Sequence, residues 1–168
     1  KIQNFLERVE VYLPFFFFFH FTIDTQNTFP HSSGIASSAS GMAALAVNFM
    51  SLEKQLNPLM TAEYFNRKAS FLARLGSGSA CRSVKGKVVI WGNHEETENS
   101  SDLFGIEFVE LHSNFENYQD TILLVDKGEK QVSSTVGHDL MNNHPFAEKR
   151  FEQAHQNLSK IKNSLKNG

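Results

Sequence analysis

Hydrophobic positions recur at helical spacing in several stretches of the chain. The first dozen residues predict an amphipathic helix, whose apolar positions are Ile2, Phe5, Leu6, Val9 and Leu13. Residues 40–52 predict a second helix, so rich in Ala, Met and Leu that it must be buried on most sides. Thr61 is a good N-cap for a third helix, which runs to Leu75 and ends at Gly76.

A long helix is also predicted near the C-terminus. It starts after Pro145, covers residues 146–165 and carries an apolar stripe formed by Phe151, Ala154, Leu158 and Ile161. Alternating or β-branched segments predict strands at 20–29, 87–91, 104–111 and 121–125. The run of five phenylalanines at 15–19 is interpreted as a loop or strand entry, partly buried against the core. Helices and strands mixed in this order predict an α+β protein rather than a repeating βαβ sheet.

Composition excludes several classes of function. A net charge of −2 over 168 residues provides no basic field for wrapping nucleic acid. The apolar run around residues 14–21 is far shorter than the ~20 residues that a membrane span needs. Cys81 is the only cysteine, so no internal disulfide can form, and a reducing cytoplasm is expected. The seven histidines show no metal-ligand spacing, so no metal site is predicted from them.

Two loops carry the chemistry that the sequence suggests. Residues 30–41 combine Gly, Ser and Ala immediately before the predicted helix at 40–52. A small-residue loop that opens a helix presents unpaired backbone N–H groups, which favour an anion such as phosphate. Residues 74–83 add Arg82, whose guanidinium can hold a carboxylate or phosphate with two parallel hydrogen bonds. The loops together predict an enzyme that handles a phosphorylated, carboxylated small molecule.

The same segments resemble known motifs. The pattern Pro-x-x-x-Gly-Ile-x-Ser-Ser-Ala at residues 30–39 resembles the phosphate-binding motif of the GHMP kinase superfamily. The run Gly-Ser-Gly-Ser-Ala-Cys-Arg-Ser at residues 76–83, followed by Gly86 and Trp91, resembles the diphosphomevalonate decarboxylase family within that superfamily. A third segment, residues 126–137, also resembles this family. The three matches occur in the family's order and cover roughly residues 30–140.

The resemblance implies an activity and its cosubstrates. Members of this family use ATP, with Mg²⁺, to decarboxylate mevalonate 5-diphosphate to isopentenyl diphosphate, releasing ADP, phosphate and CO2. A related GHMP small-molecule kinase, a decarboxylase of the monophosphate and an inactive fragment remain alternatives. A diphosphate needs more hydrogen-bond donors than a monophosphate does. The sequence alone does not show how many donors surround the substrate.

The resemblance also implies the residues of the site. The ATP-binding residues would be Gly34, Ala36, Ser37, Ser38 and Ala39. Those that bind the substrate would be Ser77, Gly78, Ser79, Ala80, Cys81, Arg82 and Thr135. Arg82 and Ser79 would be catalytic, with Arg82 on the departing carboxylate. On the residues alone, Arg82 could be a surface ion pair, and Cys81 is expected to be a packing residue rather than a nucleophile.

The resemblance implies a two-domain fold of which this chain is an incomplete part. Residues 1–115 would belong to an ATP-binding domain similar to a ribosomal-protein and elongation-factor domain, and residues 116–168 would begin a ferredoxin-like domain. The family's N-terminal lysine segment has no match before His20, and its catalytic aspartate would lie beyond residue 168. We therefore expect no decarboxylase activity from these residues alone. Relatives of this kind are typically homodimers, which makes a homodimer the expected assembly.

Overall fold

The computed structural model describes residues 1–29, 35–123 and 134–168, although not the side chains of Ser134 and Thr135. Its backbone contacts divide the chain into two compact units. The first contains the residues before position 30 together with Ile35–Phe108, and the second contains Val109–Gly168. The predicted division at 115/116 stays a prediction.

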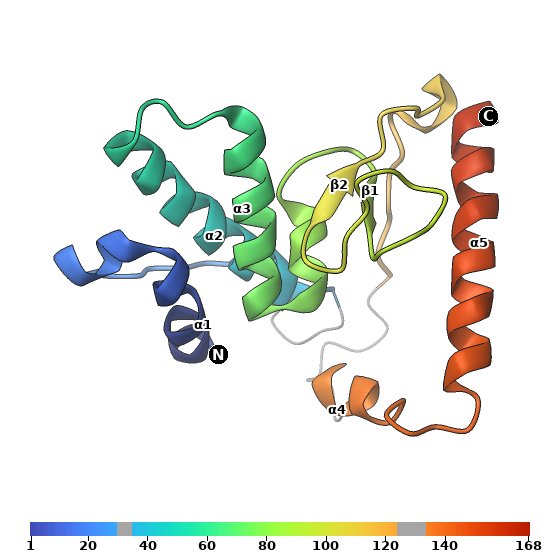
Figure 1. Cartoon of the computed structure of the whole chain (residues 1–168), viewed down its shortest axis with the longest axis horizontal. Helices are drawn as coiled ribbons and strands as arrows, with labels where there is room; N and C mark the ends of the chain where they lie inside the picture. Colours follow the sequence, from blue (N-terminus) through green and yellow to red (C-terminus); the bar gives the residue numbers. More distant parts are fainter. Residues whose placement is uncertain (30–34, 124–133) are drawn as a thin grey trace. The chain divides into compact units, whose positions relative to one another are not determined.

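Three helices form the core of the first unit (Figure 1). They are α1 (Ile2–Val9), α2 (Ser37–Leu56) and α3 (Ala62–Gly76), and α3 packs against both of the others. Short 3₁₀ turns follow α1 at Glu10–Tyr12 and Pro14–Phe18. The largest fully buried side chains of this core are Phe5, Val9, Leu13, Met50 and Leu72. These contacts give α2 and α3 a fixed relation, on which the site described below depends.

The helices of this unit confirm the periodicity predictions. The N-terminal helix buries Phe5 and Val9, and α2 is longer at both ends than predicted. The Thr61 Oγ1 accepts a hydrogen bond from the Tyr64 N–H at 3.2 Å, which confirms the predicted N-cap of α3. Gly76 is the last residue of that helix.

A two-stranded antiparallel sheet completes the first unit. Strands β1 (Val89–Trp91) and β2 (Gly105–Glu107) pair with Ile90 opposite Ile106. The polar loop between them is closed by a hydrogen bond of 2.9 Å from the Trp91 Nε1–H to the Asp102 carbonyl. Both strands fall inside predicted strand segments. The mixture of helices with a small antiparallel sheet is compatible with the predicted α+β class.

The strand predicted at residues 20–29 is wrong. All ten of these residues are described, and none lies in a strand. A strand exists only when a neighbouring strand satisfies its backbone groups, and no such partner pairs with this segment within the described part of the chain. Alternation and β-branched residues therefore indicated an extended segment but not a sheet.

The phenylalanine run forms a 3₁₀ turn whose rings divide between core and solvent. Phe15 is buried, and the Phe16 ring meets the Phe49 ring of α2 edge-on, with 4.8 Å between centroids. Phe17 and Phe18 are 78% and 81% exposed. A turn with three residues per repeat cannot direct five consecutive rings to one face. The predicted partial burial is confirmed in that sense.

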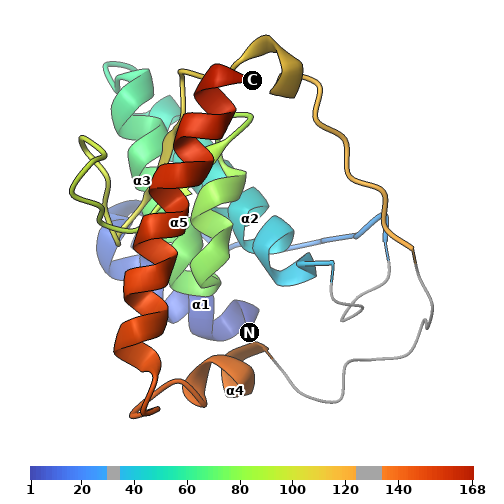
Figure 2. The ribbon, with the colours of Figure 1, turned by 90° about the vertical axis from the view of Figure 1, so that its right-hand side faces the viewer.

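The second unit contains a 3₁₀ turn at Ser113–Phe115 and two helices, α4 (Ser134–Asp139) and α5 (Ala147–Asn167). Figure 2 shows α5 as one uninterrupted helix, and it begins after Pro145 as predicted. Its end is tied to the start of the unit, because the His112 N–H donates to the Leu165 carbonyl at 2.8 Å and Lys166 pairs with Glu110.

Two apolar segments of this unit are more exposed than their sequence suggests. None of the 21 residues of α5, all described, is buried, and Phe151 and Ile161 of the predicted stripe are each more than half exposed. Residues 121–123 form no strand, and Leu123 is 84% exposed, which contradicts a buried strand there. The remaining residues of that predicted strand, 124 and 125, lie outside the described residues. Apolar composition predicted that these segments would be buried, but composition alone does not determine which other residues they contact.

Candidate functional site

The first part of the predicted site is the N-terminus of α2. Ala36 precedes the helix in the left-handed conformation, with φ of 55° and ψ of 34°. Its carbonyl accepts hydrogen bonds from the N–H groups of Ala39, at 2.9 Å, and Ser40, at 3.3 Å. The N–H groups of Ser37 and Ser38 lie in the first turn of the helix, where no carbonyl group of the helix is available to accept their hydrogen bonds. This end of α2 therefore carries the positive end of the helix dipole, and the predicted binding of phosphate there stays a prediction.

Only part of the predicted ATP loop can be placed. Ser37 and Ser38 are half-buried and Ala39 is buried. The Lys1 Nζ lies 3.4 Å from the Ser38 Oγ, which adds a cation beside the helix start. Gly34 lies outside the described residues.

The second part is a 3₁₀ turn at Gly78–Ser83, called the 78–83 turn below. Ser77 leads into it with an extended backbone, and the Ala80 N–H donates to the Ser77 carbonyl at 2.8 Å. Ala80 and Cys81 are buried, whereas Arg82 is exposed. The turn thus anchors its middle in the core and leaves its arginine at the surface.

The two residues predicted to be catalytic lie on one face of the 78–83 turn. In a 3₁₀ helix, side chains three positions apart are eclipsed. Ser79 and Arg82 have this spacing, and Ser79 is half-buried beside the exposed Arg82. A hydroxyl and a guanidinium on one face form a suitable donor set for an anionic oxygen.

Close packing brings the start of α2 near the 78–83 turn. A β-carbon on Gly76, directly before the turn, would lie 2.6 Å from the Met42 Sδ and 2.7 Å from a ring carbon of Phe5. Met42 follows Ser38 by one helical turn of α2, and α2 also packs directly against the 78–83 turn. The two predicted loops of the first unit therefore belong to one region of the molecule.

The Trp91 ring packs against Gly78, the first residue of the turn. A β-carbon on Gly78 would lie 3.1 Å from the Trp91 Cη2. Because such a contact is tighter than ordinary van der Waals separation, glycine at this position lets the turn approach the indole. Strand β1 thereby packs against the 78–83 turn through the Trp91 ring.

Cys81 is a packing residue, as predicted. Its side chain is 2% exposed and its Sγ lies 3.1 Å from the Gly78 carbonyl. Burial raises the pKa of the thiol from 9.0 to about 11, and the nearby Arg82 and Arg74 only partly offset this rise. The thiol is therefore protonated at neutral pH, which excludes a thiolate nucleophile there.

Thr135, the last predicted substrate-binding residue, lies in α4 of the second unit. Its side chain is outside the described part of the structure, so its proposed contact with substrate stays a prediction. No group of three His, Cys, Asp or Glu side chains suited to a metal ion occurs among the residues that the structure describes. Likewise, no helix within the described ranges is long and apolar enough to cross a membrane.

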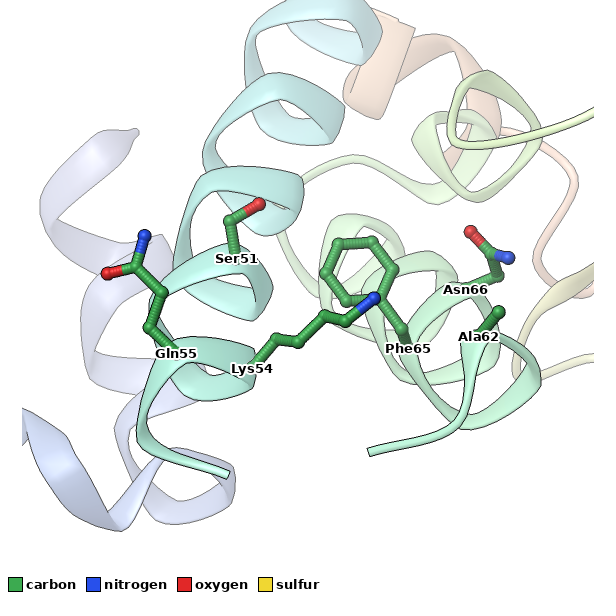
Figure 3. A pocket seen from close by; sticks show the side chains of 6 residues that line it. All are labelled: Ser51, Lys54, Gln55, Ala62, Phe65 and Asn66. Carbon is green, nitrogen blue, oxygen red and sulfur yellow. The ribbon is translucent and has the colours of Figure 1, made fainter. Parts of the chain in front are cut away.

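A separate pocket, called the hollow below, lies between the C-terminal end of α2 and the N-terminal end of α3. It has a volume of about 540 Å³ and is lined by Ser51, Lys54, Gln55, Ala62, Phe65 and Asn66. Figure 3 shows the Lys54 side chain reaching across to Phe65, whose ring centroid is 5.8 Å from the Lys54 Nζ. Ser51 is 13 residues after Ser38, or roughly 20 Å along the helix axis. None of the predicted site residues lines this hollow.

Comparison with known proteins decides the family. Residues 1–102, which include both loops of the first unit, match the family described as the diphosphomevalonate decarboxylase-like N-terminal domain. The chain belongs to this family. This result confirms the resemblance drawn from residues 76–83.

Curated members of the diphosphomevalonate decarboxylase family are similar over most of this chain. The diphosphomevalonate decarboxylase of Debaryomyces hansenii is 40% identical over 115 residues, which are 68% of this chain and 27% of that protein. The Ganoderma lucidum enzyme is 36% identical over 132 residues, 79% of this chain and 31% of the relative. The Saccharomyces cerevisiae enzyme is 34% identical over 140 residues, 83% of this chain and 33% of the relative. This member of the family thus spans about a third or less of these relatives, and no solved structure matches it.

The family motif does not reveal every residue that shapes the site. Ser70 of α3 is 3% exposed and forms hydrogen bonds with both the 78–83 turn and the start of β2. Its only signal in the sequence is a hydroxyl residue between Ala69 and Phe71 in an otherwise apolar stretch of helix.

Proposed function

We propose that this chain forms part of an enzyme that decarboxylates mevalonate 5-diphosphate in an ATP-dependent reaction of isoprenoid biosynthesis. The observation that carries the proposal is the family match over residues 1–102, which contain the Ser79 and Arg82 face and the α2 N-terminus together. The proposed fold is that of a GHMP kinase-like enzyme with two domains. The enzyme is proposed to be a homodimer and to act in the cytoplasm.

The proposed chemistry assigns one task to each loop. Backbone N–H groups at Gly34 and Ala36–Ser38 would bind the ATP phosphates, with Ala39 packed behind them, and Mg²⁺ would arrive with the nucleotide and neutralise part of its charge. The 3-hydroxyl of mevalonate 5-diphosphate accepts the γ-phosphoryl group, with ADP as the leaving group and the hydroxyl proton released to a base or to solvent. The C3–O bond to this new phosphate then breaks, and the C1–C2 bonding pair forms the C2=C3 double bond as CO2 departs.

Within this proposal the 78–83 turn binds the substrate. The Ser77 and Ser79 hydroxyls and the backbone around Gly78 would donate to diphosphate oxygens. Arg82 would hold the C1 carboxylate in line for its departure, with Thr135 adding a donor from the second unit. Positioning of this kind lowers the barrier because the reacting groups are ordered before the chemical step. Ser79 and Arg82 are the residues with catalytic assignments.

Direct binding tests the substrate assignment. Titration calorimetry would measure binding of mevalonate 5-diphosphate to this chain, with mevalonate 5-phosphate and inorganic pyrophosphate as competing probes. Arg82→Ala should weaken binding of the diphosphate by about tenfold or more, because it removes a hydrogen bond to a charged group. Arg150→Ala, which removes another exposed arginine, in α5, should leave affinity unchanged. Equal affinity for the monophosphate would instead favour the monophosphate decarboxylase alternative.

Product analysis tests the reaction type. C1-labelled substrate with Mg-ATP would be incubated with the complete enzyme of which this chain is proposed to form part, while ADP and labelled CO2 are followed together. Release of both in equal amounts supports decarboxylation. Formation of ADP without CO2 would identify a kinase and remove the assignment of Arg82 to the departing carboxylate.

A further inference from the structure

Ser70 is the point at which three segments of the first unit meet. Its hydroxyl donates to the Cys81 carbonyl at 2.7 Å and accepts from the Gly105 N–H at 2.9 Å. The first partner belongs to the 78–83 turn and the second begins β2. One buried hydroxyl on α3 therefore fixes the turn and the strand to the same helix.

The neighbours of Ser70 on α3 hold the same strand start. The Arg67 guanidinium lies over the Phe104 ring, 4.3 Å from its centroid, and the Arg74 Nε–H donates to the Leu103 carbonyl at 3.0 Å. Residues 67, 70 and 74 share one helix face, because they are spaced by three and four positions. Side chains on this face therefore contact three consecutive residues, 103, 104 and 105.

The packing at this junction leaves little room for adjustment. A β-carbon on Gly105 would lie 3.0 Å from the Cys81 carbonyl oxygen and 2.6 Å from the Val89 Cγ1. The strand backbone thus lies directly against the turn backbone at the place where Ser70 binds both. A shift of either segment would break one of its hydrogen bonds.

The bond to Cys81 acts on the peptide unit that ends in Arg82. The Cys81 carbonyl and the Arg82 nitrogen belong to one planar group, so a hydrogen bond to the carbonyl oxygen fixes the orientation of that plane. Together with the φ angle of Arg82, this plane sets the direction in which the Arg82 Cα–Cβ bond leaves the turn. We infer that Ser70 is a positioning residue, which orients Arg82 toward the bound anion without touching it. The inference concerns the substrate site of the proposed function and rests on it for its ligand.

Hydrogen exchange tests the positioning independently of any ligand. In Ser70→Ala, the Gly105 amide and the amides of residues 81–84 should exchange about tenfold faster or more, because the turn and strand lose their shared partner. Amides within α2 and the first half of α3 should keep their protection. Uniform acceleration across the unit would mean that Ser70 contributes only to global stability, and unchanged exchange at Gly105 would overturn the inference.

A double-mutant cycle tests whether Ser70 acts through Arg82. Ser70→Ala should weaken binding of mevalonate 5-diphosphate by about tenfold, whereas Ser70→Ala combined with Arg82→Ala should bind no more weakly than Arg82→Ala alone. Additive losses would overturn the inference. Ser51→Ala is the matched control, because the Ser51 Oγ donates to the Val47 carbonyl at 2.8 Å in α2, away from the turn.

One result separates this inference from the proposed function. If the wild-type chain binds no mevalonate 5-diphosphate, the substrate assignment fails while the exchange experiment still decides whether Ser70 holds the turn.

Ser70→Thr keeps the hydroxyl and should restore protection at Gly105 if it folds. Ser70→Cys offers the same test with a smaller change in volume and a weaker donor, and should restore protection only in part.

Discussion

Gly76 and Met42 pack so closely that the end of α3 has no space for a side chain. A β-carbon on Gly76 would lie 2.6 Å from the Met42 Sδ, with Phe5 equally close on the other side. Both neighbours are buried core residues. The glycine therefore matters for the approach of α3 to α1 and α2 and not for an unusual backbone angle.

Gly76→Ala should destabilise the protein by about 1–3 kcal/mol, because the added methyl group overpacks the junction. Urea unfolding followed by circular dichroism would measure the change. Gly41→Ala is the matched control, since Gly41 lies within α2 with nothing within 4 Å of its absent β-carbon. That variant should gain about 0.5–1 kcal/mol from the better helix propensity of alanine. Equal effects of the two substitutions would contradict the packing explanation.

The N-cap of α3 gives a second prediction. Thr61→Ala removes the acceptor for the Tyr64 N–H and should cost about 1 kcal/mol of unfolding free energy. Thr61→Ser retains the hydroxyl and should lose far less. Thermal or urea unfolding of the two variants would separate the cap from the loss of side-chain volume. A Thr61→Ser variant as unstable as Thr61→Ala would show that the hydrogen bond is not the cause.

The sequence predicted the helices of the first unit because their determinants are local. Thr61 as a cap, Pro58 after α2 and Gly76 at the end of α3 each act within a few residues of their own position. A strand depends on a partner that can lie anywhere in the chain. Residues 20–29 have strand-like composition but no pairing among the described residues, and composition could not reveal this.

The motif at residues 76–83 located the segment between α3 and β1 and singled out Arg82, because small residues and an arginine in that order are specific. The binding roles assigned to these residues stay predictions. The 3₁₀ form of this segment, which brings Ser79 and Arg82 onto one face, follows from packing against α2 and α3. The contact of Ser70 with Cys81 joins residues 11 positions apart on different elements, so only the fold could disclose it.

Burial should decide the value of two ion pairs that have the same shortest N–O distance. Glu53 and Lys68 join α2 to α3 with an N–O distance of 2.7 Å, and their side chains are only 18% and 14% exposed. Lys149 and Glu152 on α5 have the same distance but side chains that are 79% and 57% exposed. Glu53→Gln should therefore cost about 1–3 kcal/mol, because it leaves a shielded ammonium without its charge partner.

Glu152→Gln is the control for this prediction, and its effect should stay within about 0.5 kcal/mol, since exposed pairs are screened by water. Urea unfolding at low and high salt would measure both variants. The wild-type advantage over Glu53→Gln should also be less sensitive to salt than the advantage over Glu152→Gln. Similar costs for the two variants would show that burial does not strengthen the Glu53–Lys68 pair.

The thiol of Cys81 makes stability depend on pH in the alkaline range. Burial raises its pKa from 9.0 to about 11 in the folded protein. Between these two values the unfolded chain has lost the thiol proton and the folded chain has kept it, so the folded state binds more protons. Unfolding free energy must then fall as pH rises through this window, by up to about 1.4 kcal/mol per pH unit from this group. Below pH 9 the thiol is protonated in both states and contributes no slope.

Cys81→Ala removes this ionisation and leaves the other alkaline titrations of the chain in place. The difference in unfolding free energy between wild type and Cys81→Ala should therefore be constant from pH 7 to 8.5 and should shift in favour of the variant between pH 9 and 11. Urea unfolding at half-unit pH steps would measure it. A parallel pair of curves across the whole range would mean that the folded thiol ionises as readily as the unfolded one, and that Cys81 is less sheltered from water than its packing indicates.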